Sequence, residues 1–227
     1  MTKPSKLDER ERLLRVELAK RTINTHRDDD NERKLAEDSP EVLSIGKQIA
    51  SLIDEERLEE ARERLHRELE KRPDEMMFLN IQVILDVLDK PFGNYDSAKK
   101  YCSLLMECAV KKDNIYYTWV ALNNMALIAH NEGHDDFSKL MYLAAHFFDK
   151  KAFTPLINLA GWNARRNNLE EAQKWIELIL ETYQDWLKNE EIVTAFKKDE
   201  CLHNLRSYEP FRKRVLAEIS KEQKHGN

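Results

Sequence analysis

Glycine, proline and cysteine are scarce in this chain. Its 227 residues include five glycines, six prolines and three cysteines. So little glycine and proline, together with 35% charged residues and few β-branched runs, favours an all-α fold of helices joined by short turns. Cys102, Cys108 and Cys201 form no CxxC pair, which argues against a zinc site or a disulfide framework. We expect them to be small core residues in a reducing compartment.

Long apolar runs and an excess of positive charge are also missing. No segment approaches the roughly 18 uninterrupted apolar residues of a membrane span, and the N-terminus has no run resembling a signal-peptide core. The net charge is −5, whereas nucleic-acid-binding domains usually present a basic face. We therefore expect a cytoplasmic protein with no membrane contact, and nucleic acid is disfavoured as a partner.

Catalytic and nucleotide-binding motifs are absent: the sequence contains no HExxH, GxSxG, P-loop or glycine-rich fingerprint. His130 and His134 have metal-ligand spacing for a helix, but Gly133 should break that helix. Cys201 and His203 are close in sequence, yet a thiolate nucleophile needs a base in contact and a protected pocket. We expect no enzyme activity, no catalytic residue, no metal site and no cofactor.

What the sequence does contain is a repeat. Residues 119–152 and 153–186 align without a gap at an offset of about 34 residues, the tetratricopeptide period. Residues of similar size or polarity recur, in the pairs Leu122 and Leu156, Asn124 and Asn158, Met125 and Leu159, Ala126 and Ala160, Tyr142 and Ile176, and Ala145 and Ile179. Gly133 and Asn167 stand at the turn inside each copy, where a positive φ is commonly needed.

Weaker copies precede this pair, at about residues 42–75 and 79–112. Ser39 and Pro40 should begin the first helix, since serine caps a helix N-terminus and proline suits its first position. Asp74 is expected to cap the next helix, which is apolar on nearly every side and should therefore be sandwiched between neighbours.

Three segments are expected. Residues 1–38 form a charged arm, either a solvated tail or a helix that docks on the rest of the chain. Residues 39–187 form the helical repeats, and residues 188–227 form capping helices with a polar tail. The end of a repeat array has no neighbour to cover its apolar face. The proposed cover consists of Leu202, Leu205, Pro210, Phe211 and Val215.

On these residues the chain resembles the tetratricopeptide repeat (TPR) proteins, of a bacterial type with a C-terminal capping element. The resemblance covers about residues 42–186, although Asp86 and Ser138 stand where small residues or alanine are usual. In the last repeat it is carried by Leu156, Asn158, Leu159, Ala160, Leu169, Ala172, Ile176 and Ile179. It implies a right-handed α-solenoid of about four helix pairs, whose first helices line a concave groove that binds an extended peptide or a helix.

We therefore expect a non-catalytic protein–protein interaction scaffold or adaptor. Its candidate partner-binding residues are Asn123, Asn124, Asn131, Asn158, Gly161, Trp162 and Arg165. Amides can clasp a peptide backbone, although asparagines at these positions can equally bond between helices. Arg165 would bind an acidic side chain or a terminal carboxylate, and Gly161 would let the ligand approach closely.

The alternative function is a regulatory helical-repeat subunit that binds RNA or a nucleotide-bearing ligand. The candidate positions are mostly neutral amides and lack the basic stripe or base-reading pairs that RNA requires, which favours the scaffold. The sequence leaves open the identity of the partner, the oligomeric state, and whether the groove or the convex face binds.

Overall fold

The structure of the chain, a computed structural model, describes residues 38–89 and 93–225. Within these residues every regular element is a helix and no strand occurs, which confirms the all-α prediction. The chain divides into two compact units, residues 1–149 and residues 150–227, called here the N-terminal unit and the C-terminal unit.

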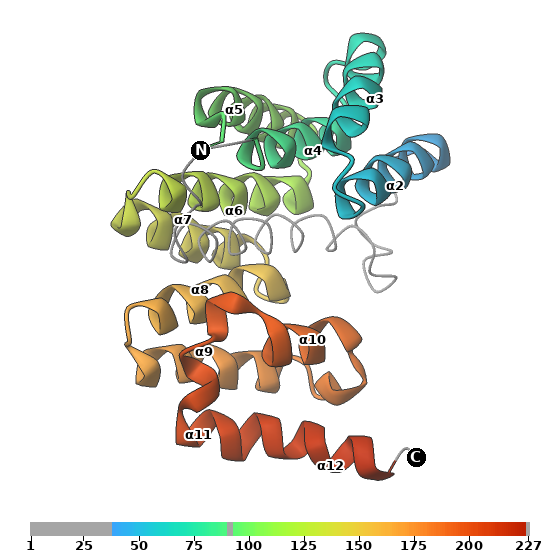
Figure 1. The fold of residues 1–227 in the computed structure, drawn as a ribbon. Helices are drawn as coiled ribbons and strands as arrows, with labels where there is room; N and C mark the ends of the chain where they lie inside the picture. The colour runs from blue at the N-terminus through green and yellow to red at the C-terminus, as the bar shows by residue number, and fades with distance from the viewer. Residues whose placement is uncertain (1–37, 90–92, 226–227) are drawn as a thin grey trace, which may run out of the picture. The chain divides into compact units, whose positions relative to one another are not determined.

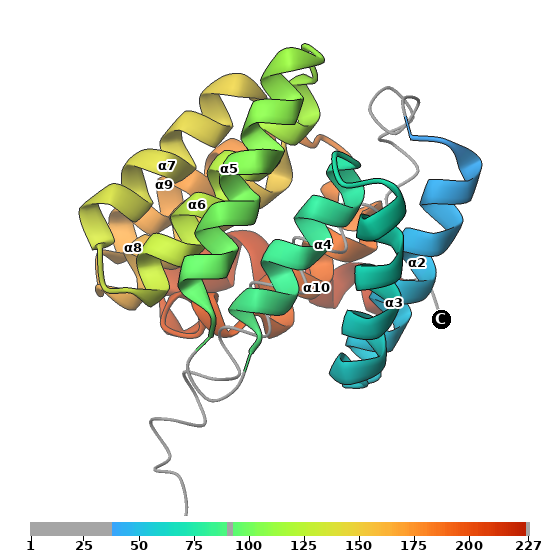
Figure 2. The same cartoon turned by 90° about the horizontal axis from the view of Figure 1, so that it is seen from above.

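The described part of the N-terminal unit consists of paired helices joined by short turns (Figure 1). They are α2 (Pro40–Asp54), α3 (Leu58–Lys71), α4 (Met76–Val87), α5 (Tyr95–Lys111), α6 (Ile115–Asn131) and α7 (Asp135–Phe148). Each helix packs against the next in sequence, and α4 also contacts α2 and α6. Figure 2 shows the α2–α3 pair lying side by side.

The helix starts agree with the sequence at α2 but not at α4. Ser39 Oγ accepts a hydrogen bond from the Val42 N–H at 3.2 Å, and Pro40 is the first residue of α2, as predicted. The residue before α4 is Glu75, and no side chain caps that helix. The predicted cap Asp74 is wrong because it stands one position too early in the chain.

The turns inside helix pairs contain the left-handed backbone that the sequence predicted. Gly133 has φ of 82° and Asn167 has φ of 59°. Glu56 takes the same conformation, with φ of 60°, between α2 and α3. Glycine and asparagine tolerate this backbone region well. The sequence therefore predicted the left-handed residue at Gly133 and Asn167 but not at Glu56.

α4 lies at the centre of the N-terminal unit, as its uniform apolar character predicted. Every residue from Met76 to Val87 except Gln82 is buried. Two of the buried residues are polar, Asn80 and Asp86. The helix is therefore enclosed by its neighbours α2, α3, α5 and α6, and its polar groups need partners inside the protein.

The predicted N-terminal arm lies outside the described residues except for its last residue, Asp38. That residue is buried, and its Oδ2 accepts a hydrogen bond from the Tyr117 hydroxyl at 2.7 Å. Burial raises the pKa of Tyr117 well above its ordinary value, so the phenol stays protonated and donates. Asp38 thus belongs to the packed part of the chain rather than to a solvated tail.

The C-terminal unit contains two long helices followed by shorter elements. The helices are α8 (Phe153–Arg165), α9 (Leu169–Thr182), α10 (Glu190–Lys198), α11 (Glu209–Phe211) and α12 (Ala217–His225). A π-helical turn, Arg212–Leu216, joins α11 to α12, and 3₁₀ turns occupy Trp186–Lys188, Glu200–Leu202 and Leu205–Ser207. No helix in residues 38–89 and 93–225 has both the length and the apolar character that crossing a bilayer requires.

Four of the five residues predicted to form the cap are buried in the apolar core of the C-terminal unit. Phe211 is fully buried and packs edge-to-face on Phe196, with ring centroids 5.8 Å apart. Phe196 in turn meets Trp186 at 5.7 Å. The same apolar cluster includes Ile176 and Ile179 of α9. Of the predicted covering residues, only Pro210 is exposed.

Candidate binding surface on the first helices

The candidate asparagines of the N-terminal unit lie on α6, and two of them face inward. Asn123 and Asn124 are each 1% exposed. The Asn124 Nδ2 donates to Oδ1 of Asn80 on α4 at 2.6 Å. This amide therefore bonds between helices, which was the alternative to peptide binding. Asn131, at the C-terminal end of α6, is partly exposed.

Asn80 is the partner that the sequence analysis missed. It is fully buried in α4, and its signal was an amide inside an otherwise apolar helix. Buried side-chain amides are almost always hydrogen-bonded, so two such residues on the contacting helices α4 and α6 favour an amide pair between those helices.

The candidates of the C-terminal unit lie on α8, where Asn158 and Trp162 are both buried. A Cβ atom added to Gly161 would stand 2.6 Å from the Cβ of Cys201. Gly161 therefore makes room for the turn Glu200–Leu202 of the same unit. The close approach that we expected for a ligand is made by the chain itself.

Arg165 is the charged candidate whose donors have no acceptor, and the Nδ2 of Asn131 is a second such donor. The Arg165 side chain is partly exposed, but Nε, Nη1 and Nη2 each expose less than 1 Å². None of the three has a hydrogen-bond acceptor in the described residues. Nη1 lies 3.6 Å from the position that a Cβ on Gly161 would occupy. The guanidinium is thus shielded from water along α8 with its donors unused.

Trp162 is covered by a residue that the sequence analysis did not select. The guanidinium carbon of Arg166 lies 3.8 Å from the centroid of the Trp162 ring, and Nη1 of Arg166 donates to the Trp162 carbonyl at 3.1 Å. An arginine four residues after a tryptophan on a helix predicts such a cation–π contact.

Asp86, which departs from the repeat pattern, is buried among polar partners. It accepts a hydrogen bond from Gln82 Nε2 at 2.8 Å, and Arg62 Nη1 lies 3.6 Å from the same oxygen. Burial raises the pKa of the Asp86 carboxyl above its ordinary value, more than these partners lower it. The position accommodates a carboxylate because Gln82 and Arg62 surround it.

The cysteines lie in the packed parts of both units. Cys102 and Cys201 are buried and Cys108 is partly exposed. Burial raises the pKa of the Cys102 thiol to about 12, so it remains protonated at neutral pH. Cys201 is buried whereas His203 is exposed, and no hydrogen bond in the described residues joins the two.

The two histidines with metal-ligand spacing do not share a helix. α6 ends at Asn131 and α7 begins at Asp135, with Gly133 in the left-handed region between them. His130 Nδ1 lies 3.5 Å from an Asp135 carboxylate oxygen. The described ranges contain no group of three or more His, Cys, Asp or Glu side chains arranged to hold a metal ion.

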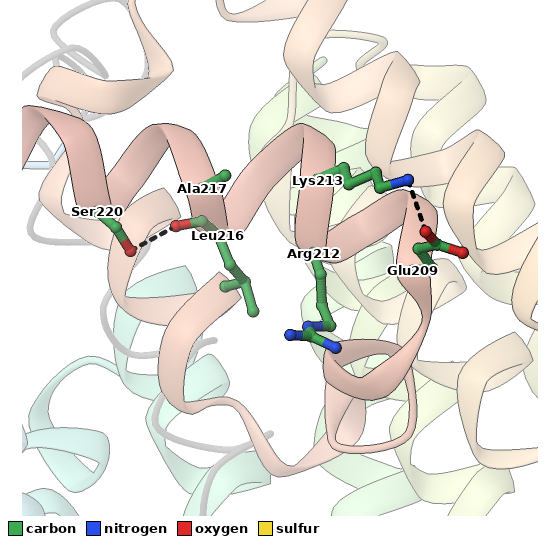
Figure 3. A pocket seen from close by; sticks show the side chains of 6 residues that line it. All are labelled: Glu209, Arg212, Lys213, Leu216, Ala217 and Ser220. Atoms are coloured by element: carbon green, nitrogen blue, oxygen red, sulfur yellow. Dashed lines mark hydrogen bonds and ion pairs between the residues drawn. The ribbon is translucent and has the colours of Figure 1, made fainter.

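A surface hollow of about 560 Å³ lies along the last helical stretch (Figure 3). It is lined by Glu209, Arg212, Lys213, Leu216, Ala217 and Ser220. Lys213 is paired with Glu209 at 2.6 Å. All six side chains come from one continuous helical segment, so the hollow has a single wall and does not enclose a ligand.

The candidate residues thus fall into two sets, with Asn123, Asn124 and Asn131 on α6 of the N-terminal unit. The second set, on α8 of the C-terminal unit, contains Asn158, Gly161, Trp162 and Arg165. Two candidates, Asn131 and Arg165, combine partial exposure with buried donors that have no acceptor in the described residues, and Arg165 is the charged one. No protein-family model, curated protein or solved structure matches the chain.

Proposed function

We propose that this chain is a TPR-like, non-catalytic scaffold or adaptor that binds an acidic segment or free C-terminus of a partner protein. The repeated sequence of residues 119–186 supports a repeat architecture. So does the packing of α4 against α2 and α6, because the first helices of successive pairs are in contact. Repeat arrays of this kind present extended surfaces rather than closed active sites.

The unused guanidinium of Arg165 is the observation that carries the proposal. An arginine has five N–H donors, and burying them without acceptors is costly. A carboxylate satisfies two of these donors at once in a bidentate, charge-assisted pair. The residue is partly exposed although its guanidinium nitrogens are buried, so the proposal requires the guanidinium to turn outward when a partner carboxylate binds.

The RNA-binding alternative receives less support from the same residues. Sequence-tolerant RNA binding relies on exposed aromatic rings and a basic groove. Trp162 is buried beneath Arg166, the C-cap residue of α8, and the candidate amides are neutral. A carboxylate is therefore a better match for Arg165 than a nucleic acid.

The test is selection of peptides from a displayed random library with free C-termini, using the full-length chain as bait. Selected peptides are then synthesised and their affinities measured by calorimetry. Arg165→Gln should weaken binding by tenfold or more, equivalent to about 1.4 kcal/mol. Replacing the peptide's terminal carboxylate by an amide, or its acidic residues by glutamine, should have the same effect on wild type and none on the variant.

Arg212→Gln is the matched control, because it removes the same charge from an exposed position in the same unit. It should leave the affinity within about twofold, as for surface substitutions away from a site. If the two arginine variants lost affinity equally, the loss would come from the change in net charge and not from a contact with Arg165. Tight binding of single-stranded RNA, with no peptide selected, would instead favour the regulatory RNA-binding subunit.

A further inference from the structure

One face of α7 carries a stripe of large apolar side chains that the described protein does not cover. Phe137 is 48% exposed, Leu140 56%, Phe147 77% and Phe148 51%. Their spacing places them on one side of the helix. Ser138, Tyr142 and Ala145 point to another side and are fully buried, so α7 is apolar both toward the core and toward solvent.

This concentration is uneven across the molecule. The described residues contain seven large apolar side chains that are exposed, and four of them lie on this one helix. Scattered exposed apolar residues are ordinary, but contiguous patches on soluble domains mark interaction sites. Phenylalanine is also enriched at the centres of protein interfaces. The α7 stripe therefore has the composition of an interface.

The charges at the two ends of α7 indicate what covers the stripe. Asp135 and Asp136 form the first turn of the helix. Lys150 and Lys151 follow its C-cap Asp149 directly in the chain, so that end has a net positive charge. A second α7 laid antiparallel would place the acidic start of each helix beside the basic end of the other. A parallel pair would bring like charges together.

The distribution of side-chain size along the stripe is compatible with this antiparallel pairing. Phe137 stands near one end, Phe147 and Phe148 at the other, and the small Ala144 lies between Leu140 and Phe147 on the same face. In an antiparallel copy, Phe137 of one helix lies near Phe148 of the other at both ends of the pair. The small middle residue lets the two helices approach closely.

We propose that α7 is a homodimerisation surface, on which the α7 of a second copy of this chain packs antiparallel about a two-fold axis. The contact is isologous, so Asp136 of each copy meets Lys150 of the other. One helix face buries less than a standard interface of about 1,600 Å². The dimer is therefore weak, with a dissociation constant in the roughly micromolar range.

Sedimentation velocity of the full-length chain, over concentrations from about 1 to 500 μM, tests the proposal. Wild type should change from monomer to dimer within that range. Phe147→Glu should raise the dissociation constant by a hundredfold or more, and circular dichroism should show an unchanged helical signal because the side chain is largely exposed. Val110→Glu, which adds the same charge at a 63% exposed position on α5, should leave the dimer intact.

Charge reversal distinguishes the antiparallel pairing from other contacts. Asp136→Lys alone and Lys150→Glu alone should each weaken the dimer, whereas the double variant should restore it toward wild type. A monomer at all concentrations, or a dimer insensitive to Phe147→Glu, would overturn the proposal. Failure of the double variant to regain affinity would also overturn it, since the stated register requires that pair.

Discussion

Both units bury some polar side chains, but they differ in the large apolar side chains that they expose. The N-terminal unit buries Asn80, Asp86, Asn123 and Asn124, and it contains all seven of the exposed large apolar side chains found in the described residues. The C-terminal unit buries a continuous apolar cluster from Phe153 to Ile219. The C-terminal unit thus encloses its large apolar side chains, whereas the exposed phenylalanines of the N-terminal unit form a surface that another chain can cover.

The largest expected effect comes from comparing Phe211→Ala with Phe147→Ala, because the same truncation is made once in each unit. Phe211 is fully buried in the apolar cluster, so its removal leaves a cavity and should lower the free energy of unfolding by about 3–5 kcal/mol. Phe147 is 77% exposed, and its truncation should change that free energy by no more than about 0.5 kcal/mol. Urea denaturation followed by circular dichroism measures both.

Phe211→Ala should in addition promote association, because the apolar end of α9 loses its cover. These measurements require a dilute sample, so that self-association does not contribute to the apparent stability of wild type. Equal losses in the two variants would contradict the contrast between the units. A Phe211→Ala midpoint equal to that of wild type would show that the capping element does not close the core.

The all-helical fold, two of the left-handed turns and the burial of the predicted C-terminal apolar residues could be predicted from the sequence, because they depend on side-chain size and turn chemistry. Leu202, Leu205 and Phe211 are all buried as expected, and Gly133 and Asn167 adopt the left-handed turn. Helix starts were less certain: a capping aspartate and a residue one position too early look alike in sequence, which explains the error at Asp74.

The candidate surface was harder to predict, since an amide on a first helix serves equally well inside or outside. Whether Asn124 faces a ligand or Asn80 depends on the distance between α6 and α4, which sequence spacing does not encode. Gly161 posed the same difficulty, because both a ligand and the Cys201 turn require the missing side chain. Arg165 keeps its predicted role as a proposal because its donors remain unused.

A double-mutant cycle at Asn80 and Asn124 measures how much the hydrogen bond between these two buried amides contributes to stability. Either single change to leucine leaves a buried amide without its partner and should cost about 1–3 kcal/mol of unfolding free energy. The double change removes both polar groups, so it should cost less than the sum of the two single changes. Additive losses in urea denaturation would indicate that the 2.6 Å contact contributes nothing.

The smallest expected effect is the contribution of Asp86 to the pH dependence of stability. The direction of this contribution follows from the burial of the carboxyl group. The folded protein holds the carboxyl pKa above the ordinary value of 3.8, chiefly because burial disfavours the charged form. As the pH rises from 3.8 toward the folded pKa, the unfolded chain loses this proton first, so the stability contributed by Asp86 falls. Asp86→Asn removes the titrating group and keeps an oxygen that accepts from Gln82.

The stability difference between Asp86→Asn and wild type should therefore shift in favour of the variant as the pH rises through this window, and then level off. Groups common to both proteins, such as Glu75, whose pKa burial also raises, cancel in the difference. Urea midpoints measured from about pH 4 to pH 7 provide the comparison. A difference that stays constant would mean that burial and the polar partners offset each other, whereas one that moves toward wild type would mean that partners such as Arg62, 3.6 Å away, outweigh burial. The buried charge would then stabilise the N-terminal unit.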